Sequence, residues 1–340
     1  MGNTVRLKKV SLSLLIAAAV LLGVGTLTQR YFERQDADQY PAPGVLIDVN
    51  GTRLHLRCIG EGSPTVVMIA GAGAPSVVSY ELQDRIAPQT RVCSYDRAGL
   101  GWSEPANREQ GVAEVTRDLH DLLDQAEETG PFIFAPESYG GLIALLAALE
   151  WPGKVAGIVL IDASEPDLWF EKTADTLGPL RRHTALMTFG WRTGIVRAGL
   201  DYGQPDWIDE MSVQNREWFQ AIYSRDMPGY GEYDSAFRLT DPTIYDRLES
   251  QGLGSLPITV LAHGKVPNGL PPEFADGWMT AQKKLSGYSN ASELIIRQNS
   301  GHAIAGEDPD FVAAHIIRMI EHIRSQNMTG LIKQQHREGA

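Results

Sequence analysis

Short apolar runs alternate with longer amphipathic stretches along most of the chain. The runs are TVVMIA (65–70), RVCSY (91–95), FIFA (132–135), VAGIVLID (155–162), ITVLA (258–262) and ELIIR (293–297). Residues 112–123 and 312–323 instead repeat apolar side chains at helical spacing. This alternation predicts an α/β fold with a mostly parallel sheet and helices on both faces. VLIDV and TRLHLRC flank Asn50 and Gly51, so we expect an antiparallel hairpin before the parallel strands.

The most apolar stretch lies near the N-terminus. Residues 10–28 carry no charge, and three basic side chains precede them within residues 1–9. A run of this length can cross a bilayer as a helix, and the basic flank predicts a cytoplasmic N-terminus with the body of the protein outside. The alternative is a signal peptide that is cut near Gly23 or Gly25, which would release a secreted protein.

Polarity and proline content divide the rest of the chain. Residues 29–43 are polar and end in two prolines, which predicts a linker. We expect a core formed by residues 44–163 and 255–324. Between them, in residues 164–254, the strand rhythm stops, which predicts a helical cap inserted into the core. Residues 325–340 are expected to form a polar, frayed tail.

Composition narrows the possible partners. Of the 340 residues, 43% are apolar, which is enough for a sizeable core. The net charge of -12 argues against nucleic acid or anionic lipid headgroups as the main partner, because both would be repelled at long range. The only cysteines, Cys58 and Cys93, are too few for a disulfide scaffold or a metal cluster. They are either two buried thiols or, in an exported protein, one disulfide bridge.

The stretch FAPESYGG, residues 134–141, contains the candidate nucleophile. Ser138 follows an apolar strand and precedes an apolar helix, and such a tight turn strains the backbone and exposes the hydroxyl. Pro136 replaces the first glycine of the usual GxSxG pattern; proline fits an extended backbone but has no N–H.

Two backbone N–H groups, those of Tyr139 and of Ala72 in the glycine-containing loop after strand 65–70, are expected to form an oxyanion hole.

His302 is the candidate base. It lies in the loop NSGHAI between the last strand and the last helix, where an imidazole can reach a serine at the same edge of the sheet. His263 also ends a strand and is the only serious rival. The chain order serine, acid, histidine favours His302.

These motifs together resemble the alpha/beta hydrolase superfamily over about residues 44–323. YDRAGLGWSEP (95–105) is similar to the loop after the fourth strand of many members, and GEGSPTVVMIAGAG, PESYGG, VLIDASEPD and SGHAI lie around it in the family's order. The resemblance implies an eight-stranded, mostly parallel sheet with a helical cap inserted after the sixth strand. It also implies that strands two and four are neighbours, which would bring Cys58 beside Cys93 and favours the disulfide.

The resemblance leaves two positions for the catalytic acid. Most members carry an aspartate shortly after the seventh strand, where this chain has Pro267 and Asn268. Some relatives carry the acid at the end of the sixth strand, which corresponds to Asp162, and we expect the acid there. Glu273, in the later loop, is the alternative.

Three other charged residues lie within these motifs. The resemblance implies that Asp96 and Arg97 brace the loops around the site. Glu137, next to the candidate nucleophile, is expected to be solvated or ion-paired, and the alternative is that it tunes a contact with the substrate.

The residues and the resemblance predict a serine hydrolase that is membrane-tethered or exported and needs no metal or organic cofactor. Ser138 would attack a carbonyl, His302 would transfer the proton, and Asp162 would orient the imidazole and balance its charge. A carboxylic ester is the first substrate class and an amide the second, and the aromatic cap residues suggest an apolar group. The alternatives are a non-catalytic binding protein, and a lyase or cofactor-free peroxidase on the same fold.

Overall fold

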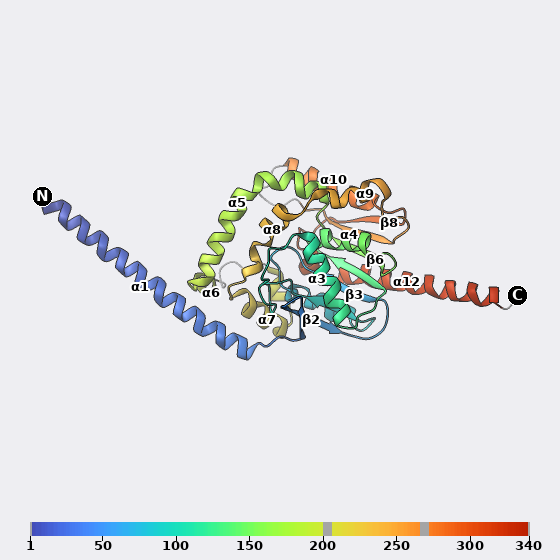
Figure 1. Cartoon of the computed structure of the whole chain (residues 1–340), viewed down its shortest axis with the longest axis horizontal. Coiled ribbons are helices and arrows are strands. Elements are labelled where there is room, and N and C mark those ends of the chain that lie inside the picture. The colour runs from blue at the N-terminus through green and yellow to red at the C-terminus, as the bar shows by residue number, and fades with distance from the viewer. Residues whose placement is uncertain (1, 200–205, 266–271, 339–340) are drawn as a thin grey trace.

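The computed structural model describes residues 2–199, 206–265 and 272–338, and an eight-stranded sheet forms the centre of this part of the chain (Figure 1). The strand order is β1-β2-β4-β3-β5-β6-β7-β8. β1 and β2 form an antiparallel pair, β2 is also antiparallel to β4, and the remaining neighbours are parallel. The predicted fold is therefore confirmed. The strands are β1 (Val45–Val49), β2 (Thr52–Ile59), β3 (Thr65–Ile69), β4 (Val92–Tyr95), β5 (Phe132–Pro136), β6 (Val155–Ile161), β7 (Ile258–His263) and β8 (Ser292–Arg297).

The hairpin between β1 and β2 follows from its two turn residues. Asn50 has φ 55° and Gly51 has φ 82°. A two-residue turn with positive φ at both positions matches the twist of paired strands, and asparagine and glycine tolerate it best. Asp48 Oδ1 accepts a hydrogen bond of 2.9 Å from the N–H of Gly51 and supports the turn.

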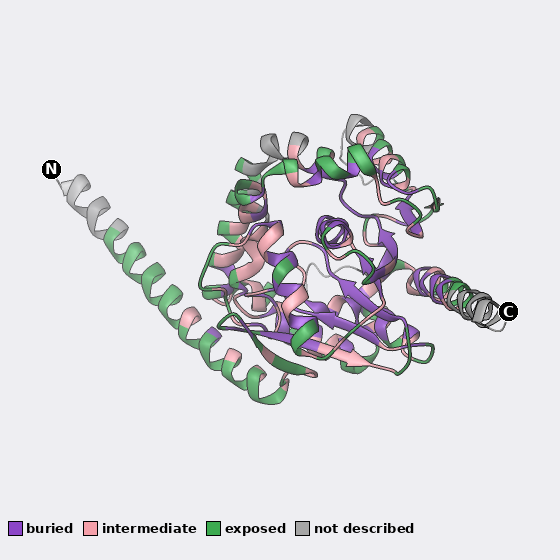
Figure 2. Cartoon of the chain, turned by 45° about the vertical axis from the view of Figure 1, so that its right-hand side comes forward, coloured by how far each residue is buried: buried purple, intermediate pink, exposed green. Residues whose placement is uncertain are grey.

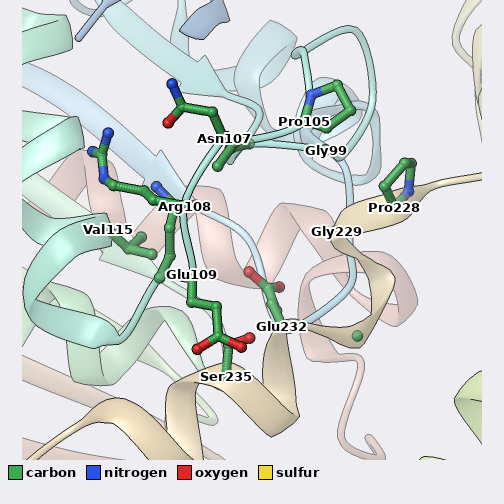
Figure 3. A pocket seen from close by; sticks show the side chains of 14 residues that line it. Gly99, Pro105, Asn107, Arg108, Glu109, Val115, Pro228, Gly229, Glu232 and Ser235 are labelled. Carbon is green, nitrogen blue, oxygen red and sulfur yellow. The ribbon is translucent and has the colours of Figure 1, made fainter. Parts of the chain in front are cut away.

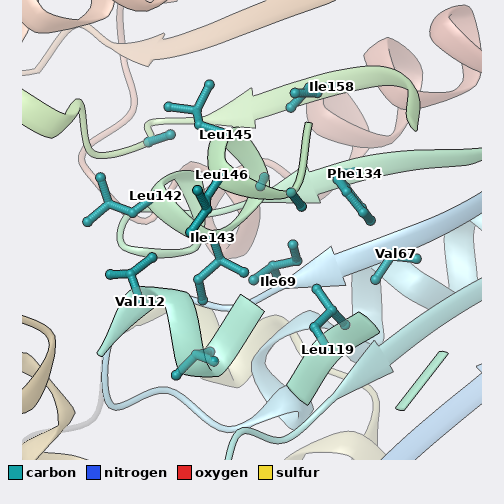
Figure 4. Packing of buried hydrophobic residues seen from close by; sticks show 14 of the residues in the cluster. Val67, Ile69, Val112, Leu119, Phe134, Leu142, Ile143, Leu145, Leu146 and Ile158 are labelled. Carbon is teal, nitrogen blue, oxygen red and sulfur yellow. The ribbon is translucent and has the colours of Figure 1, made fainter. Parts of the chain in front are cut away.

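Helices cover both faces of the sheet and explain why the central strands are apolar throughout. On β3, Val67 and Ile69 belong to a core shared with α3 and α4, whereas Val66 and Met68 belong to a second core shared with α2 and α12. Figure 4 shows Ile69 between Leu119 of α3 and the side chains of α4, with Val67 further along β3 in the same cluster. A parallel strand buried on both faces has no polar side, unlike a strand with one wet face. The helices are α2 (Tyr80–Ile86), α3 (Val112–Gln125), α4 (Gly140–Glu150), α10 (Pro272–Gly287), α11 (Ile304–Glu307) and α12 (Pro309–Glu338).

The segment between β6 and β7 contains only helices among its described residues, as the fold prediction required. These helices form the cap, whose buried aromatic side chains include Trp169 and Trp191. They are α5 (Pro166–Arg192), α6 (Ile195–Gly199), α7 (Val213–Tyr223), α8 (Glu232–Leu239) and α9 (Asp246–Gln251), with the 3-10 turns η3 (Asp206–Glu210), η4 (Pro228–Gly231) and η5 (Pro242–Tyr245). A further 3-10 turn, η1 (Ser76–Ser79), precedes α2.

The N-terminal helix α1 (Gly2–Gln39) projects away from the body for about half of its length (Figure 1). It is the one helix, among the described residues, that is long and apolar enough to cross a membrane. From Leu12 to Leu27 its large apolar side chains are exposed, as the green colour in Figure 2 shows, so this part of α1 is not a core helix. The helix also continues through most of the predicted linker 29–43, because the polar residues there find partners on the cap.

The C-terminal helix α12 likewise runs into the predicted tail. Its first half carries the apolar stripe, with Val312, Ile316 and Ile320 buried against the sheet. The helix then continues to Glu338, so the backbone of residues 325–338 is helical where the sequence predicts fraying. This segment contains three glutamines and one each of leucine, methionine, lysine, arginine and glutamate, all good helix formers, which can extend a helix that packing has already started.

Candidate active site

The chain turns sharply at Ser138, between β5 and α4. Ser138 has φ 48°, a left-handed conformation that is costly for a residue with a side chain. A Cβ at Gly140 would lie 2.4 Å from the carbonyl oxygen of Ile69, so only glycine lets α4 pack this close to β3. The turn therefore has the strained geometry that the sequence predicts for a nucleophile elbow.

Pro136 fits at the last position of β5. It pairs with Ile69 in the parallel register, and the ladder continues beyond it through hydrogen bonds from Glu137 N to Ile69 O (2.9 Å) and from Ser138 N to Ile161 O (3.2 Å). These bonds hold both sides of the turn. The missing N–H of the proline thus leaves the position of Ser138 intact.

The three candidate catalytic residues lie together at the carboxyl edge of the sheet. His302 Nε2 is 3.1 Å from Ser138 Oγ, and His302 Nδ1 is 2.5 Å from Asp162 Oδ2. Asp162 follows β6, has φ 43° and is fully buried. The chain reaches this edge with Ser138 after β5, Asp162 after β6 and His302 after β8, because the carboxyl ends of parallel strands share one edge.

His263 contacts the acid and has no hydrogen bond to the serine. Its Nδ1 is 2.6 Å from Asp162 Oδ2, and its backbone N–H donates to Oδ1 at 3.1 Å. Trp278 Nε1 donates to the same Oδ1 at 3.0 Å. The sequence suggested His263 only as a rival base. Its position at the end of β7, the strand next to β6, is the signal that could have identified it as a partner of Asp162.

These contacts set the charges of the site. Burial alone would raise the pKa of Asp162, but hydrogen bonds from His263 and His302 lower that pKa to about 2. Partial burial opposes protonation of His302, yet the hydrogen bond and charge of Asp162 raise the His302 pKa above its usual value. Asp162, His263 and His302 are also close enough to hold a metal ion, but hydrogen bonds between them already occupy the atoms that would bind it.

The alternative position for the catalytic acid, after β7, falls in or beside a segment outside the described residues. Pro267 and Asn268 lie outside the described residues. Glu273 is at the second position of α10, and its side chain lies outside the described part of the structure.

The predicted oxyanion donors belong to two segments that lie directly beside Ser138. A Cβ at Gly71 would lie 3.4 Å from Ser138 Cβ, so the loop after β3 passes directly beside the serine. Among the described residues, the backbone N–H groups of Ala72 and Tyr139 have no hydrogen-bond partner. Two free donors on either side of Ser138 are what a developing oxyanion needs.

A buried ion pair fixes this loop to the cap. Arg97 donates to the carbonyl oxygens of Ala70 (2.7 Å) and Gly71 (2.5 Å) and makes two bonds of 2.7 Å to Glu232 of α8. Glu232 Oε1 also accepts from the N–H of Gly73 at 2.5 Å. Arg97 therefore braces the loop, as the resemblance implies.

Asp96 braces the neighbouring loops. Its carboxylate accepts from the N–H groups of Ser76 (2.5 Å) and Trp102 (3.0 Å) and lies 2.8 Å from His55 Nδ1. None of these partners is a candidate catalytic residue, and the contacts connect two loops, which agrees with the bracing role that the resemblance implies.

A cavity of about 220 Å³ adjoins the serine. Ser138, His302 and Glu137 line it together with Trp207 of η3 and Tyr223 of α7. A larger hollow of about 440 Å³ lies between the loop 98–110 and α8, and Figure 3 shows Glu232 at its inner end. None of the candidate catalytic residues lines that hollow, so the smaller cavity is the candidate substrate site.

Glu137 differs from its sequence-based prediction. Within the described residues its carboxylate has neither an ion pair nor a hydrogen bond, although its side chain is partly buried. Burial raises the pKa of Glu137 to about 7; the charge of His302 opposes this rise and that of Asp162 adds to it. The site therefore contains a carboxyl group that changes charge near neutral pH.

Sequence comparisons identify related proteins. Residues 66–315 match the profile of the Alpha/beta hydrolase family. The uncharacterized protein YqjL of Bacillus subtilis is 30% identical over 253 residues, which cover 74% of this chain and 82% of YqjL. The uncharacterized protein YbdG of Bacillus subtilis is 25% identical over 155 residues, or 45% of this chain. The chain spans about half the length of several such relatives, 48% in the case of YbdG.

Solved structures with the same fold include two hydrolases. The Cif epoxide hydrolase from Acinetobacter nosocomialis aligns with a TM-score of 0.67 at 15% identity, over 87% of this chain and 96% of its own. The enol-lactonase from Burkholderia xenovorans aligns with a TM-score of 0.59 at 18% identity, over 82% of this chain and 100% of its own. At these identities the likeness concerns the fold alone.

Proposed function

Because this chain belongs to the alpha/beta hydrolase family, we propose that it is a serine hydrolase that cleaves carboxylic esters through an acyl-enzyme. The observation that carries the proposal is one continuous hydrogen-bonded line, from Ser138 Oγ to His302 Nε2 and from His302 Nδ1 to Asp162. Nucleophile, base and orienting acid in this order are the arrangement that activates a serine.

Each residue has one task in the proposed reaction. His302 Nε2 takes the proton of Ser138 as Oγ attacks the carbonyl carbon, and the N–H groups of Ala72 and Tyr139 stabilise the negative oxygen. The tetrahedral intermediate then collapses, and His302 gives its proton to the departing alcohol. A water molecule repeats both steps on the acyl-enzyme and releases the acid. Asp162 keeps Nδ1 protonated and stabilises the imidazolium.

The cavity favours an ester with a compact apolar group. Its volume of about 220 Å³ and the rings of Trp207 and Tyr223 suit such a group. One relative, the pimeloyl-[acyl-carrier protein] methyl ester esterase of Aliivibrio salmonicida, is named for ester cleavage and is 34% identical over 121 residues, 36% of this chain and 43% of its own. Amides remain the second substrate class.

The proposed location is the outer side of a membrane, with α1 as a retained anchor. The basic residues before the apolar run support a cytoplasmic N-terminus. Cys58 and Cys93 are paired across β2 and β4 and bonded to each other, and such bonds persist in oxidising compartments.

A fluorophosphonate probe tests the catalytic proposal. We expect the folded protein to be labelled, and Ser138→Ala to lose the label while it keeps its circular dichroism spectrum. Ser164→Ala is the matched control: Ser164 is buried beside the elbow, its N–H bonded to Ser138 O at 2.8 Å, and it has no hydrogen bond to His302. Absence of labelling in folded wild-type protein, or labelling that survives in Ser138→Ala, would exclude a serine hydrolase with this nucleophile.

A substrate panel tests the bond type. p-Nitrophenyl esters of increasing acyl length, beside aminoacyl arylamides, should show ester turnover that is highest for short chains. Amide turnover above ester turnover would reverse the proposed order of substrate classes.

A further inference from the structure

We propose that one side of the cap, formed by the second half of α5 and by α6, lies on the surface of the membrane that α1 crosses. This inference rests on the proposed role of α1 as an anchor. It concerns residues 178–199, which have no part in the proposed chemistry. The partner is an anionic lipid surface.

The first observation is that α1 is bonded to the cap. Gln29 is 1% exposed, donates to Ser224 O at 2.6 Å and accepts from Arg197 Nε at 3.0 Å. One turn further, Glu33 accepts from the N–H of Asp226 at 3.1 Å, and Asp36 pairs with Arg197 at 2.6 Å. These contacts fix the direction in which α1 leaves the cap.

The second observation is the depth of the contact along α1. The uncharged run ends at Thr28, and three residues earlier a Cβ at Gly25 would lie 2.4 Å from Thr193 O. Three residues of helix correspond to about 5 Å along its axis. The turn between α5 and α6, which contains Thr193, is therefore level with the last apolar turn of α1, where the hydrocarbon of a bilayer gives way to its headgroups.

The third observation is the direction of α5. Figure 1 shows α5 running across the direction of α1, on the side of the body that faces the free half of α1, with the sheet behind it. A helix that crosses an anchor at the level of the bilayer boundary lies along the membrane surface. Its outer face is then at the depth of the headgroups.

The fourth observation is the chemistry of that outer face. Leu186, Phe189 and Ile195 are 69%, 49% and 55% exposed. Arg182, Leu186 and Phe189 follow one another at i, i+4 and i+7, so they share a face of α5. Exposed leucine and phenylalanine beside arginine are typical of helices that lie in a membrane interface.

The charge of this segment also differs from that of the whole chain. Residues 178–199 contain four arginines and no aspartate or glutamate, although the net charge of the chain is -12. Arg181, Arg192 and Arg197 pair with carboxylates elsewhere. Arg182 is exposed, and among the described residues it donates only to the carbonyl of Gly178. Its charge is therefore available to an anionic headgroup.

The disulfide makes a direct test simple. Both native cysteines are bonded to each other, so a cysteine introduced into the full chain is its single free thiol. An environment-sensitive fluorophore is attached to Leu186→Cys or Phe189→Cys. The matched control is Val45→Cys, an exposed valine (56%) at the start of β1 and beyond the end of α1, and Leu21→Cys reports insertion of the anchor.

Each labelled protein is placed in vesicles of phosphatidylcholine with one third phosphatidylglycerol, with and without nitroxide-labelled lipid. We expect the nitroxide to quench residues 186 and 189 at least about fivefold more than residue 45, since only an interfacial helix reaches the lipid. Arg182→Glu should reduce quenching at residue 189 in these vesicles but not in pure phosphatidylcholine.

Three results would overturn the inference. If residue 21 is quenched but residues 186 and 189 are quenched no more than residue 45, the cap face lies in water. No quenching at residue 21 would remove both the anchor and the inference. An equal effect of Arg182→Glu in both kinds of vesicle would exclude recognition of anionic headgroups. Fluorophosphonate labelling of the same preparations reports on Ser138 independently.

Discussion

Replacing Glu137 with glutamine should stabilise the protein at alkaline pH and leave its stability unchanged at acidic pH. Burial raises the pKa of Glu137 from 4.5 to about 7, so the folded state disfavours the charged carboxylate. A difference of this size corresponds to about 3 kcal/mol, and because the side chain is partly exposed to the cavity we expect about 2 kcal/mol. Glutamine has nearly the same shape and no charge, and therefore removes the penalty.

The direction of the pH effect follows from the pH at which the folded and the unfolded state each lose the proton of Glu137. At pH values below about 4.5 the carboxyl is protonated in both the folded and the unfolded state, and its ionisation costs nothing. As the pH rises toward about 7 the unfolded state ionises first, and the wild-type protein progressively loses stability. Above about pH 7 the full penalty is present. The stabilisation by Glu137→Gln should therefore be near zero at acidic pH and largest at about pH 8.

Equilibrium unfolding in urea measures this difference. The full chain in detergent is compared with Glu137→Gln at about pH 4 and about pH 8, with tryptophan fluorescence as the signal. Glu217→Gln is the control, since Glu217 is exposed on α7 and its replacement should change the unfolding free energy little at either pH. Equal stability of Glu137→Gln and wild type at the higher pH, or an equal gain at both values, would refute the buried, unpaired carboxylate.

The same substitution has a second readout. The charge of Glu137 is one of the causes that raise the pKa of His302. Without it, His302 should lose its proton at lower pH, and the acid limb of the kcat/KM profile for a neutral ester should move to lower pH. An acid limb that does not move would show that Glu137 and His302 do not interact.

Three further predictions concern the acid, its second histidine and the disulfide. Asp162→Asn should lower kcat for esters about 10³- to 10⁴-fold. If Asp162→Asn instead keeps near-normal turnover and Glu273→Gln is inactive, Glu273 is the catalytic acid. His263→Phe removes one hydrogen bond to the charged Asp162 and raises the pKa of this acid, so kcat should fall about tenfold with little change in KM; an unchanged kcat would leave His263 with a packing role only. Reduction of the Cys58–Cys93 bond, which spans 35 residues, should lower the unfolding free energy by about 3 to 4 kcal/mol, and a thiol titration should find no free thiol in the native protein; two free thiols would contradict the bond.

The hydrophobic pattern of the sequence was sufficient to predict the sheet, because the apolar positions of each strand are the positions that packing buries. The strand β3 is apolar from Val66 to Ile69 since helices cover both of its faces, and the Asn50–Gly51 turn has the dihedral angles that only a few residue types adopt readily. The sequence also predicts which serine, acid and histidine come together. Their loops follow parallel strands and so open at one edge of the sheet.

Contacts between distant segments could not be predicted in this way. Residues 29–39 are polar, which indicates a linker, yet they remain helical because Gln29 and Asp36 bond to the cap about 160 to 200 positions later. The strand order places His263 near Asp162, but the orientation of its ring, which decides whether it bonds to Ser138 or to Asp162, is not encoded in local spacing. Glu137 looked like an ordinary solvated or paired carboxylate since its burial depends on η3 and α7 of the cap.

The attachment of α1 to the cap has a mechanical consequence. If exchange of substrate and product in the proposed reaction involves a separation of the cap from the core, the attachment of α1 decides which of the two moves. Here Gln29, Glu33 and Asp36 bond the anchor to residues of the cap, and the chain passes from the end of α1 to β1 through a short connection. Any such separation moves the core relative to the anchored cap, and it also has to accommodate the hydrogen bond of 3.0 Å that Trp102 Nε1 in the core donates to the carbonyl oxygen of Tyr40, just after α1. This movement would have to break the salt bridge between Arg97 of the core and Glu232 of the cap.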